Sequence, residues 1–297
     1  MVRDLIRSMR PRQWTKNVFV FAAPLFSKIV IDEPRTLFPV VAAFSLLSFL
    51  SASVYLINDV IDRENDRQHP QKCRRPIAAG KVSPPAAILT SLILFGVSMG
   101  GAVLLRYLGP ANGYFALILG SYFALNLAYS LVLKHIVIVD VLVLSMGFVL
   151  RAMAGASAVS VEISPWLLLC TFLISLFLAF SKRRHEIVLL NEGAYSHRQI
   201  LKEYSPYLLD QMIGVVTAST VMGYALYAMN EEVQMKLGTD KRFLGTIVFV
   251  LYGIFRYLYL VHQKSEGGDP SELILSDKWL WVNILLWGLT VFLVLAF

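Results

Sequence analysis

Long apolar runs alternate with short polar stretches along the whole chain. An α-helix needs about 20 apolar residues to cross the hydrocarbon of a bilayer. Because lipid offers no hydrogen-bond partners to a backbone, spanning runs of this kind form helices. The pattern predicts an all-α, polytopic membrane protein, built as one domain over residues 1–297. Nine spans are expected, near residues 16–31, 37–57, 84–106, 113–132, 136–158, 165–181, 209–229, 242–261 and 279–297.

The first of these spans has the weakest pattern, because it is short and contains Pro24 and Lys28. A basic segment precedes it, as in the n-region of a signal peptide, but no clear small-residue cleavage site follows. The rest of the chain is also polytopic. We therefore expect a membrane span here.

Composition supports the membrane class. Of the 297 residues, 57% are hydrophobic and 16% are charged, whereas soluble domains contain about a quarter charged residues. Two explanations of the net charge of +7 stay open. The excess of Lys and Arg reflects only the orientation of the chain in the membrane, or it binds anionic lipid and phosphorylated substrates. No soluble module that combines aromatic and basic residues is present, so nucleic acid is not an expected partner. Cys73 falls in a loop and Cys170 in a span, which excludes a disulfide framework and a zinc motif.

The positions of Lys and Arg predict the orientation of the chain in the membrane. Eighteen of these residues fall at the N-terminus and in alternate loops, and five fall on the opposite side. The N-terminus is then cytoplasmic, as are the loops near 58–83 and 182–208. The expected location is the inner, or cell, membrane.

An acidic motif follows the second span directly. Asp59, Asp62 and Asp66 are three and four residues apart, and Asn58, Asp62 and Asp66 form an overlapping stripe. Both spacings place the side chains on one face of a helix, where like charges repel. A bound cation would remove that repulsion, and hard oxygen ligands suit Mg²⁺. A solvated acidic helix end is the plain alternative.

Cations surround this motif in the sequence. Pro70 and Pro76 are expected to end the acidic helix and begin a loop that contains Arg74 and Arg75. Guanidinium groups bind phosphate oxygens in a bidentate manner. Carboxylates for a metal with guanidiniums nearby are the groups needed to hold a magnesium diphosphate. No Walker loop and no G-x-G-x-x-G motif is present.

Several further polar residues lie at the ends of spans. Lys16 and Asn17 meet the hydrocarbon at the start of the first span, where a cation has to reach the interface or an anion. Tyr129 shares a polar face of the fourth span with Asn126, which a helix–helix hydrogen bond explains as well as a substrate contact does. Lys134 ends that span.

Charged residues also occur within spans five and six. Asp140 lies near the cytoplasmic end of the fifth span and is a candidate site residue, whereas a structural role suits Arg151 at least as well. At the end of the sixth span come Lys182, Arg183 and Glu186, for which a basic run of topological origin is the alternative. We interpret His185 as solvated.

The motif N-D-x-x-D-x-x-x-D at 58–66, the nine expected helices and the charged loops after spans two and six resemble the UbiA superfamily of intramembrane prenyltransferases. The resemblance covers essentially the whole chain. It implies that Asn58, Asp59, Asp62 and Asp66 hold Mg²⁺ and a diphosphate, with Asp59, Asp62 and Asp66 in the catalytic role. It also implies that a lipid tail lies between helices.

One departure from the family pattern indicates a branch. Aromatic prenyltransferases of the family carry a second D-x-x-x-D after the sixth helix, where this chain reads Ser181-Lys182-Arg183-Arg184-His185-Glu186. That segment, residues 10–17 and residues 58–80 are similar to the decaprenyl-phosphate phosphoribosyltransferase branch. The branch transfers 5-phosphoribose from phosphoribosyl diphosphate (PRPP) to a polyprenyl phosphate, on the way to the arabinose donor of some cell walls.

The resemblance therefore implies a Mg²⁺-dependent transfer that releases pyrophosphate and inverts the anomeric carbon. An ionised lipid phosphate needs no general base, which agrees with the absence of an obvious His–carboxylate pair. An aromatic or quinone prenyltransferase that uses a prenyl diphosphate and a non-enzymatic lipid-phosphate carrier are the alternatives. A homo-oligomer is one option that the sequence leaves open. The expected phosphate ligands are Lys16, Arg74, Arg75, Lys134, Lys182 and Arg183, and the expected further substrate contacts are Asn17, Tyr129, Asp140 and Glu186.

Overall fold

The computed structural model describes residues 2–68, 72–190, 199–238, 241–263, 273 and 276–296, and the residues of these ranges form helices joined by turns. Two stretches of the predicted loops lie outside the described residues, 69–71 with Pro70 and 191–198, as does the segment 264–272. The all-helical prediction is confirmed for the part of the chain that is described.

The chain divides into two compact units, with helix α8 contributing to both. Unit 1 comprises Met1–Leu25, Ile29–Lys134 and Gly147–Glu162, and unit 2 comprises Phe26–Lys28, His135–Met146 and Ile163–Phe297. The single domain over 1–297 stays a prediction.

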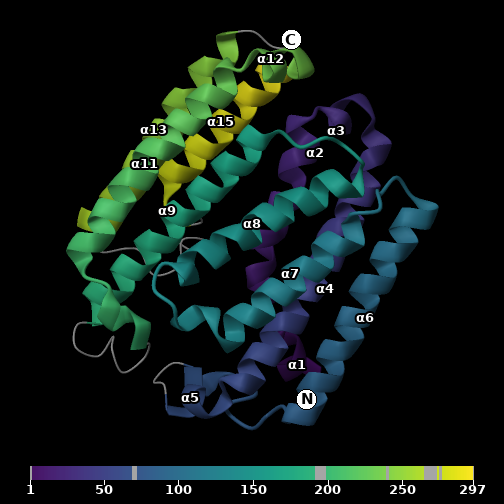
Figure 1. Ribbon diagram of the computed structural model, residues 1–297, viewed down its shortest axis with the longest axis vertical. Helices are drawn as coiled ribbons and strands as arrows, with labels where there is room; N and C mark the ends of the chain where they lie inside the picture. Colours follow the sequence, from purple (N-terminus) through teal and green to yellow (C-terminus); the bar gives the residue numbers. More distant parts are fainter. Residues whose placement is uncertain are drawn as a thin grey trace. The chain divides into compact units, whose positions relative to one another are not determined.

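Unit 1 is built around helix α4, which packs against α6, α7 and the 3₁₀-helix η1 (Figure 1). Small residues allow α4 and α6 to approach closely, since the hydroxyls of Ser53 and Ser91 lie 2.8 Å apart. Leu47, Leu50 and Phe115 are buried in the core between α4 and α7. The elements that contribute to this unit are α1 (Val2–Ser8), η1 (Pro11–Phe21), α2 (Ala22–Phe26), α3 (Ile29–Asp32), η2 (Pro34–Thr36), α4 (Leu37–Ile61), α5 (Arg63–Gln68), η3 (Lys72–Arg74), α6 (Pro84–Leu108), α7 (Phe115–Leu131), η4 (Leu133–His135) and part of α8 (Val139–Ala158).

Unit 2 is a layer of neighbouring long helices. Helix α11 packs against α9 and α13, and α13 packs against α15, as Figure 1 shows. Its core includes Phe177, Leu209 and Tyr257, with the rings of Phe177 and Tyr257 5.2 Å apart. The elements here are α9 (Pro165–Leu190), η6 (Gln199–Glu203), α11 (Pro206–Met229), α12 (Glu231–Leu237), η7 (Lys241–Thr246), α13 (Ile247–Gln263) and α15 (Lys278–Ala296).

Eight of the nine predicted spans coincide with apolar helices among the described residues. Six are long enough to cross a bilayer, and two more, Phe115–Leu131 and Lys278–Val294, are shorter. The first predicted span is instead a series of short segments, η1, α2 and α3, and is not a single helix. The physical reason lies in the backbone, since Arg10 before η1 and Lys28 after α2 both adopt left-handed conformations.

The burial pattern of η1 agrees with the geometry of a 3₁₀-helix. With three residues per turn, side chains at i and i+3 are eclipsed and share a face. Asn17 and Val20 lie on the buried face, while Thr15 and Val18 on another face are exposed. Eleven residues of 3₁₀-helix are unusual, because runs longer than three or four are uncommon.

The acidic motif does not form one continuous helix, which corrects the prediction. Helix α4 ends at Ile61, Asp62 caps it with φ −84° and ψ 4°, and α5 begins at Arg63. The hydrogen bonds nevertheless continue, because the Asp62 amide donates to the Asn58 carbonyl (2.9 Å) and the Asp66 amide donates to the Asp62 carbonyl (2.8 Å). The chain bends at Asp62 without leaving these backbone groups unpaired.

Candidate functional site

The acidic motif is interleaved with cations at the C-terminal end of α4. Nη1 of Arg75 lies 3.1 Å from a carboxylate oxygen of Asp59 and 2.6 Å from one of Asp66, so one guanidinium bridges both acids. Asp59 is only 2% exposed, and Asp66 is buried as well. Arg10, at the start of η1, donates to the same oxygen of Asp59 and lies over the ring of Tyr55. The arrangement is a chain of alternating charges.

Asp62 has a different cationic partner. Its carboxylate lies 2.7 Å from Nζ of Lys134, and both side chains are partly exposed. Lys134 belongs to η4, which follows α7. We call the six residues Arg10, Asp59, Asp62, Asp66, Arg75 and Lys134 the ion-pair cluster. It balances three acids with three cations.

A tight turn positions Arg75. The Ala79 amide donates to the Arg75 carbonyl (2.8 Å), and the Lys81 amide donates to the Pro76 carbonyl (2.8 Å). Gly80 takes a positive φ of 74°, which suits a residue without a Cβ. Ile77 inside the turn is fully buried and packs in a small cluster with residues of α4 and α6. Burial of the turn therefore fixes the backbone from which the guanidinium extends.

The carboxylates fit a divalent cation in chemistry. Aspartate and amide oxygens are the ligands that Mg²⁺ prefers, and Asp59 and Asp66 already converge on one cationic nitrogen. Among the described residues, however, no group of three or more His, Cys, Asp or Glu side chains is arranged to hold a metal. Asp62 turns to Lys134, and the side chain of the half-buried Asn58 makes no hydrogen bond to the described residues. The set could hold a metal only when Arg75 and Lys134 release the acids.

Other predicted ligands in unit 1 have diverse surroundings. Arg74 is exposed at the end of η3, directly before Arg75. Lys16 in η1 and Tyr129 in α7 are half-buried. Each of these three roles stays a prediction.

Asn17 belongs to a buried polar network, which the sequence did not reveal. It is 1% exposed, and its Nδ2 donates to the hydroxyls of Ser48 (3.0 Å) and Ser51 (3.4 Å) on α4. Its Oδ1 accepts from Nε of Arg151 (2.9 Å), whose Nη2 donates to the Tyr122 hydroxyl (2.8 Å). The structural role expected for Arg151 agrees with these contacts. Asn17 is buried like Arg151, and its predicted contact with substrate stays untested.

In unit 2, four residues form a second charged group. Asp140 is fully buried and accepts from the Tyr204 hydroxyl (2.8 Å) and from Nε of Arg183 (3.0 Å). Nη1 of Arg183 donates to Glu186 (3.0 Å). The Tyr204 hydroxyl also accepts from the Ile138 amide (2.7 Å). Asp140 therefore pairs with Arg183 and Tyr204, and its expected contact with substrate stays a prediction.

The pKa of Tyr204 is raised, first because burial disfavours the phenolate and further because the hydroxyl donates to Asp140. Tyr204 thus remains a hydrogen-bond donor at neutral pH.

The end of α9 departs from the sequence interpretation at one residue. His185 is 8% exposed, so its interpretation as solvated is wrong. Lys182, one turn earlier on the same helix, is half-buried and makes no ion pair with the described residues.

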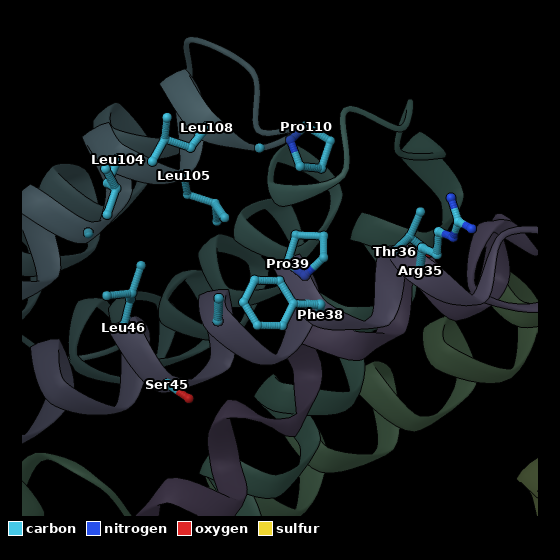
Figure 2. A pocket seen from close by; sticks show the side chains of 13 residues that line it. Arg35, Thr36, Phe38, Pro39, Ser45, Leu46, Leu104, Leu105, Leu108 and Pro110 are labelled. Atoms are coloured by element: carbon cyan, nitrogen blue, oxygen red, sulfur yellow. The ribbon is translucent and has the colours of Figure 1, made fainter.

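The groove shown in Figure 2 lies away from this chemistry. Its volume is about 740 Å³, and Phe38, Leu105 and Leu108 are among the apolar residues that line it, with Arg35 at the edge. It lies at the N-terminal end of α4, whereas the ion-pair cluster follows the C-terminal end, roughly 30 Å away by helical rise. The groove holds no acid–base pair and is not the candidate site.

Sequence reasoning missed two members of these groups as site residues. Arg10 lies in the basic segment before the first predicted span and was not among the expected ligands, yet it pairs with Asp59 across 49 positions. Tyr204 lies 64 positions from Asp140. Neither pairing has a local signal, because both depend on tertiary packing.

Comparison with known proteins gives consistent matches. The model of the UbiA prenyltransferase family matches residues 18–185. A decaprenyl-phosphate phosphoribosyltransferase of Corynebacterium glutamicum is 37% identical over 284 residues, which are 95% of this chain and 84% of that protein. A protein of the same name from Mycobacterium tuberculosis is 33% identical over 300 residues, covering 100% of this chain and 96% of that one.

Among solved structures, a UbiA homolog from Archaeoglobus fulgidus bound to DMAPP and Mg²⁺ superposes with a TM-score of 0.70. The two sequences are 18% identical, and the match covers 99% of each chain. At that identity the likeness shows the fold. With the apolar helices described above, these matches identify an integral, multi-pass membrane protein with an all-helical fold.

Proposed function

We propose, from the premise that the chain belongs to the UbiA prenyltransferase family, that it transfers 5-phosphoribose from PRPP to a polyprenyl phosphate of the decaprenyl type and releases pyrophosphate. The observation that carries the proposal is similarity over nearly the full length to two proteins named decaprenyl-phosphate phosphoribosyltransferase. The ion-pair cluster supplies the chemistry that such a reaction needs.

Both substrates are multiply anionic, and their phosphate oxygens could replace the carboxylates as partners of the cations in the ion-pair cluster. Arg75 is shared between Asp59 and Asp66, and its side chain is 26% exposed, so phosphate oxygens can reach it. Guanidinium and phosphate match in a bidentate geometry. Binding of a diphosphate would draw Arg75 away from the acids, and Lys134 would be released from Asp62 in the same manner. The displaced cations would then bind the donor.

Carboxylates freed in this exchange would hold Mg²⁺, with Asp59, Asp62 and Asp66 as ligands and Asn58 beside them. Bound there, the metal would neutralise charge on the diphosphate leaving group. The residues of this chain contribute binding and orientation: Arg75 and Arg74 contact phosphate oxygens, and Lys134 stabilises the developing negative charge.

The acceptor phosphate attacks the anomeric carbon from the face opposite the diphosphate and inverts it. It is already ionised near neutral pH, so the chain needs no general base. Further cations for the phosphate groups are Lys16, Lys182 and Arg183, the last held in place by Asp140. Tyr129 and Glu186 are proposed contacts of the sugar or of these cations.

The proposal includes the topology. Nine spans, with η1 to α3 as the first, would place the N-terminus and the ion-pair cluster in the cytoplasm, where the excess of Lys and Arg falls. Membrane lipid surrounds the spans, and a homo-oligomer is compatible with this arrangement.

A second candidate is transfer of a prenyl group from a prenyl diphosphate to an aromatic acceptor. The fold favours it equally, because the solved relative bound to DMAPP shares it. The cations at 182–184 disfavour it, because the family's second pair of acids is replaced there.

A pyrophosphate-release assay separates the candidates. Purified protein is incubated with PRPP and polyprenyl phosphate, or with prenyl diphosphate and an aromatic acceptor, each with and without Mg²⁺. We expect Mg²⁺-dependent release of pyrophosphate with PRPP and polyprenyl phosphate, and none with prenyl diphosphate and the aromatic acceptor. Release only with prenyl diphosphate would establish the second candidate, and transport of lipid phosphate without release would establish a carrier.

A further inference from the structure

One buried cation in unit 1 has no acidic partner. Arg151 is 6% exposed on α8, and none of the described residues gives it a carboxylate. Its guanidinium lies over the rings of Tyr122 and Phe148, 4.9 and 4.8 Å from their centroids. Charges inside a membrane protein are costly and rarely serve packing alone. The contacts of Arg151 therefore indicate what it does.

Those contacts lead to η1. Arg151, Phe148 and Gly155 are three and four residues apart and so share one face of α8. Arg151 donates to Asn17, and the ring of Phe148 packs edge-on against Phe19, with centroids 5.0 Å apart. Three consecutive turns of α8 thus hold one short segment of η1.

The third contact is between backbones. A Cβ added at Gly155 would lie 1.7 Å from the carbonyl oxygen of Val20, so only glycine permits this approach. η1 is fixed on its other side by α4, because Nδ2 of Asn17 donates to Ser48 and Ser51. Asn17 uses its amide in three hydrogen bonds and links α4, η1 and α8.

An unusually long 3₁₀-helix needs such support. Sparsely populated backbone conformations persist where the surroundings over-determine them, and they gather at functional sites. η1 carries Lys16 next to Asn17 and begins directly after Arg10, which belongs to the ion-pair cluster. A shift of η1 would therefore move the cations at both positions.

We propose that Arg151 is a positioning residue for the reaction: through Asn17 it fixes the 3₁₀ conformation of η1 and so places Lys16 for a substrate phosphate. The proposal rests on the proposed function, because it deepens the role of Lys16 in that site. Arg151 itself does not contact the substrate.

The conformational arm of the test is hydrogen–deuterium exchange of the full chain in detergent. In Arg151→Gln, amides of residues 12–21 exchange about tenfold faster, which corresponds to about 1.4 kcal/mol of lost protection. Amides of α6 exchange as in the unaltered protein. Gly155→Ala reproduces the effect without removing a charge. The matched controls are Arg106→Gln, an exposed cation of the same unit, and Gly96→Ala, where a Cβ meets open space.

The kinetic arm asks which substrate is affected. Lys16→Gln identifies the substrate whose KM depends on Lys16. Arg151→Gln and Gly155→Ala then raise the KM of that same substrate by about tenfold and change kcat much less. The KM of the Lys16→Gln/Arg151→Gln double variant is little higher than that of either single variant, because both substitutions remove the same contact of Lys16 with the substrate phosphate. Additive losses would overturn the proposal.

Two further outcomes would also overturn it. If Arg151→Gln raised KM while residues 12–21 exchanged normally, Arg151 would contact substrate directly. If exchange rose equally across α4, α7 and η1, its role would be general stability. If the unaltered protein did not use PRPP at all, the proposed function would fail, while the exchange arm would still decide whether Arg151 positions η1.

Discussion

Removal of Arg75 offers a test of the cation site that needs no substrate. The Arg75→Gln variant leaves the carboxylates of Asp59 and Asp66 without their shared guanidinium, although Arg10 still pairs with Asp59. Breaking a buried ion pair costs about 3–5 kcal/mol. Because the Arg75 side chain is 26% exposed, solvent screening reduces this to about 2–3 kcal/mol. The variant should unfold roughly 5–10 °C lower in detergent.

Mg²⁺ should then replace the lost cation. Ligands that bind only the folded state stabilise it by RT ln(1 + [L]/Kd), so a site emptied of arginine gains more from added Mg²⁺ than the native site does. Thermal unfolding of both proteins is followed with and without millimolar MgCl₂, with Arg106→Gln as the control for loss of a cation. We expect a larger upward shift of the melting temperature in Arg75→Gln. Equal shifts in all three proteins would refute it, because Asp59 and Asp66 would then not bind the ion.

Asp62→Asn should abolish turnover with the fold retained, and a near-normal rate in membranes at saturating Mg²⁺ would count against the metal role. Tyr204→Phe should destabilise unit 2 by about 1–3 kcal/mol by leaving buried Asp140 short of a donor. Since the pKa of Tyr204 is raised above its usual 10.0, the native protein should lose stability above about pH 10, and Tyr204→Phe should lose less in the same melting series. Asp277 caps α15 at the Leu280 amide (2.8 Å) and pairs with Arg256 (2.7 Å), so Asp277→Ala should cost about 1 kcal/mol. The bond to Arg256 lowers the pKa of Asp277, so this contribution should vanish as pH falls below its usual 3.8, and a difference that persists at lower pH would contradict the assignment.

Periodicity and hydropathy predicted most of the helices, because a membrane leaves a spanning chain few alternatives. The exception is the segment before α4. Its apolar residues predict a span, but the segment that follows the left-handed Arg10 is a 3₁₀-helix. Hydropathy does not distinguish a 3₁₀-helix from an α-helix, because residues three apart share a face in both. The type of helix in this segment is therefore a property of its backbone conformation, which the hydropathy pattern does not report.

The candidate site was predicted in its residue types and only partly in its geometry. The spacing of Asp59, Asp62 and Asp66 correctly indicated a charged group at the end of α4. It did not predict the bend at Asp62, which directs this carboxylate to Lys134 while the other two meet Arg75. Such pairings join residues up to 72 positions apart. Sequence spacing describes one helix, whereas partner choice depends on how helices pack.

The most direct test of the proposed function follows the ribose itself. Purified protein in detergent receives PRPP labelled in the ribose, a polyprenyl phosphate and Mg²⁺, and the mixture is extracted with organic solvent. The account predicts labelled lipid in the organic phase, one pyrophosphate released for each label transferred, and inverted configuration at the anomeric carbon. An organic phase without label would contradict it, if the same protein consumes prenyl diphosphate in a parallel reaction.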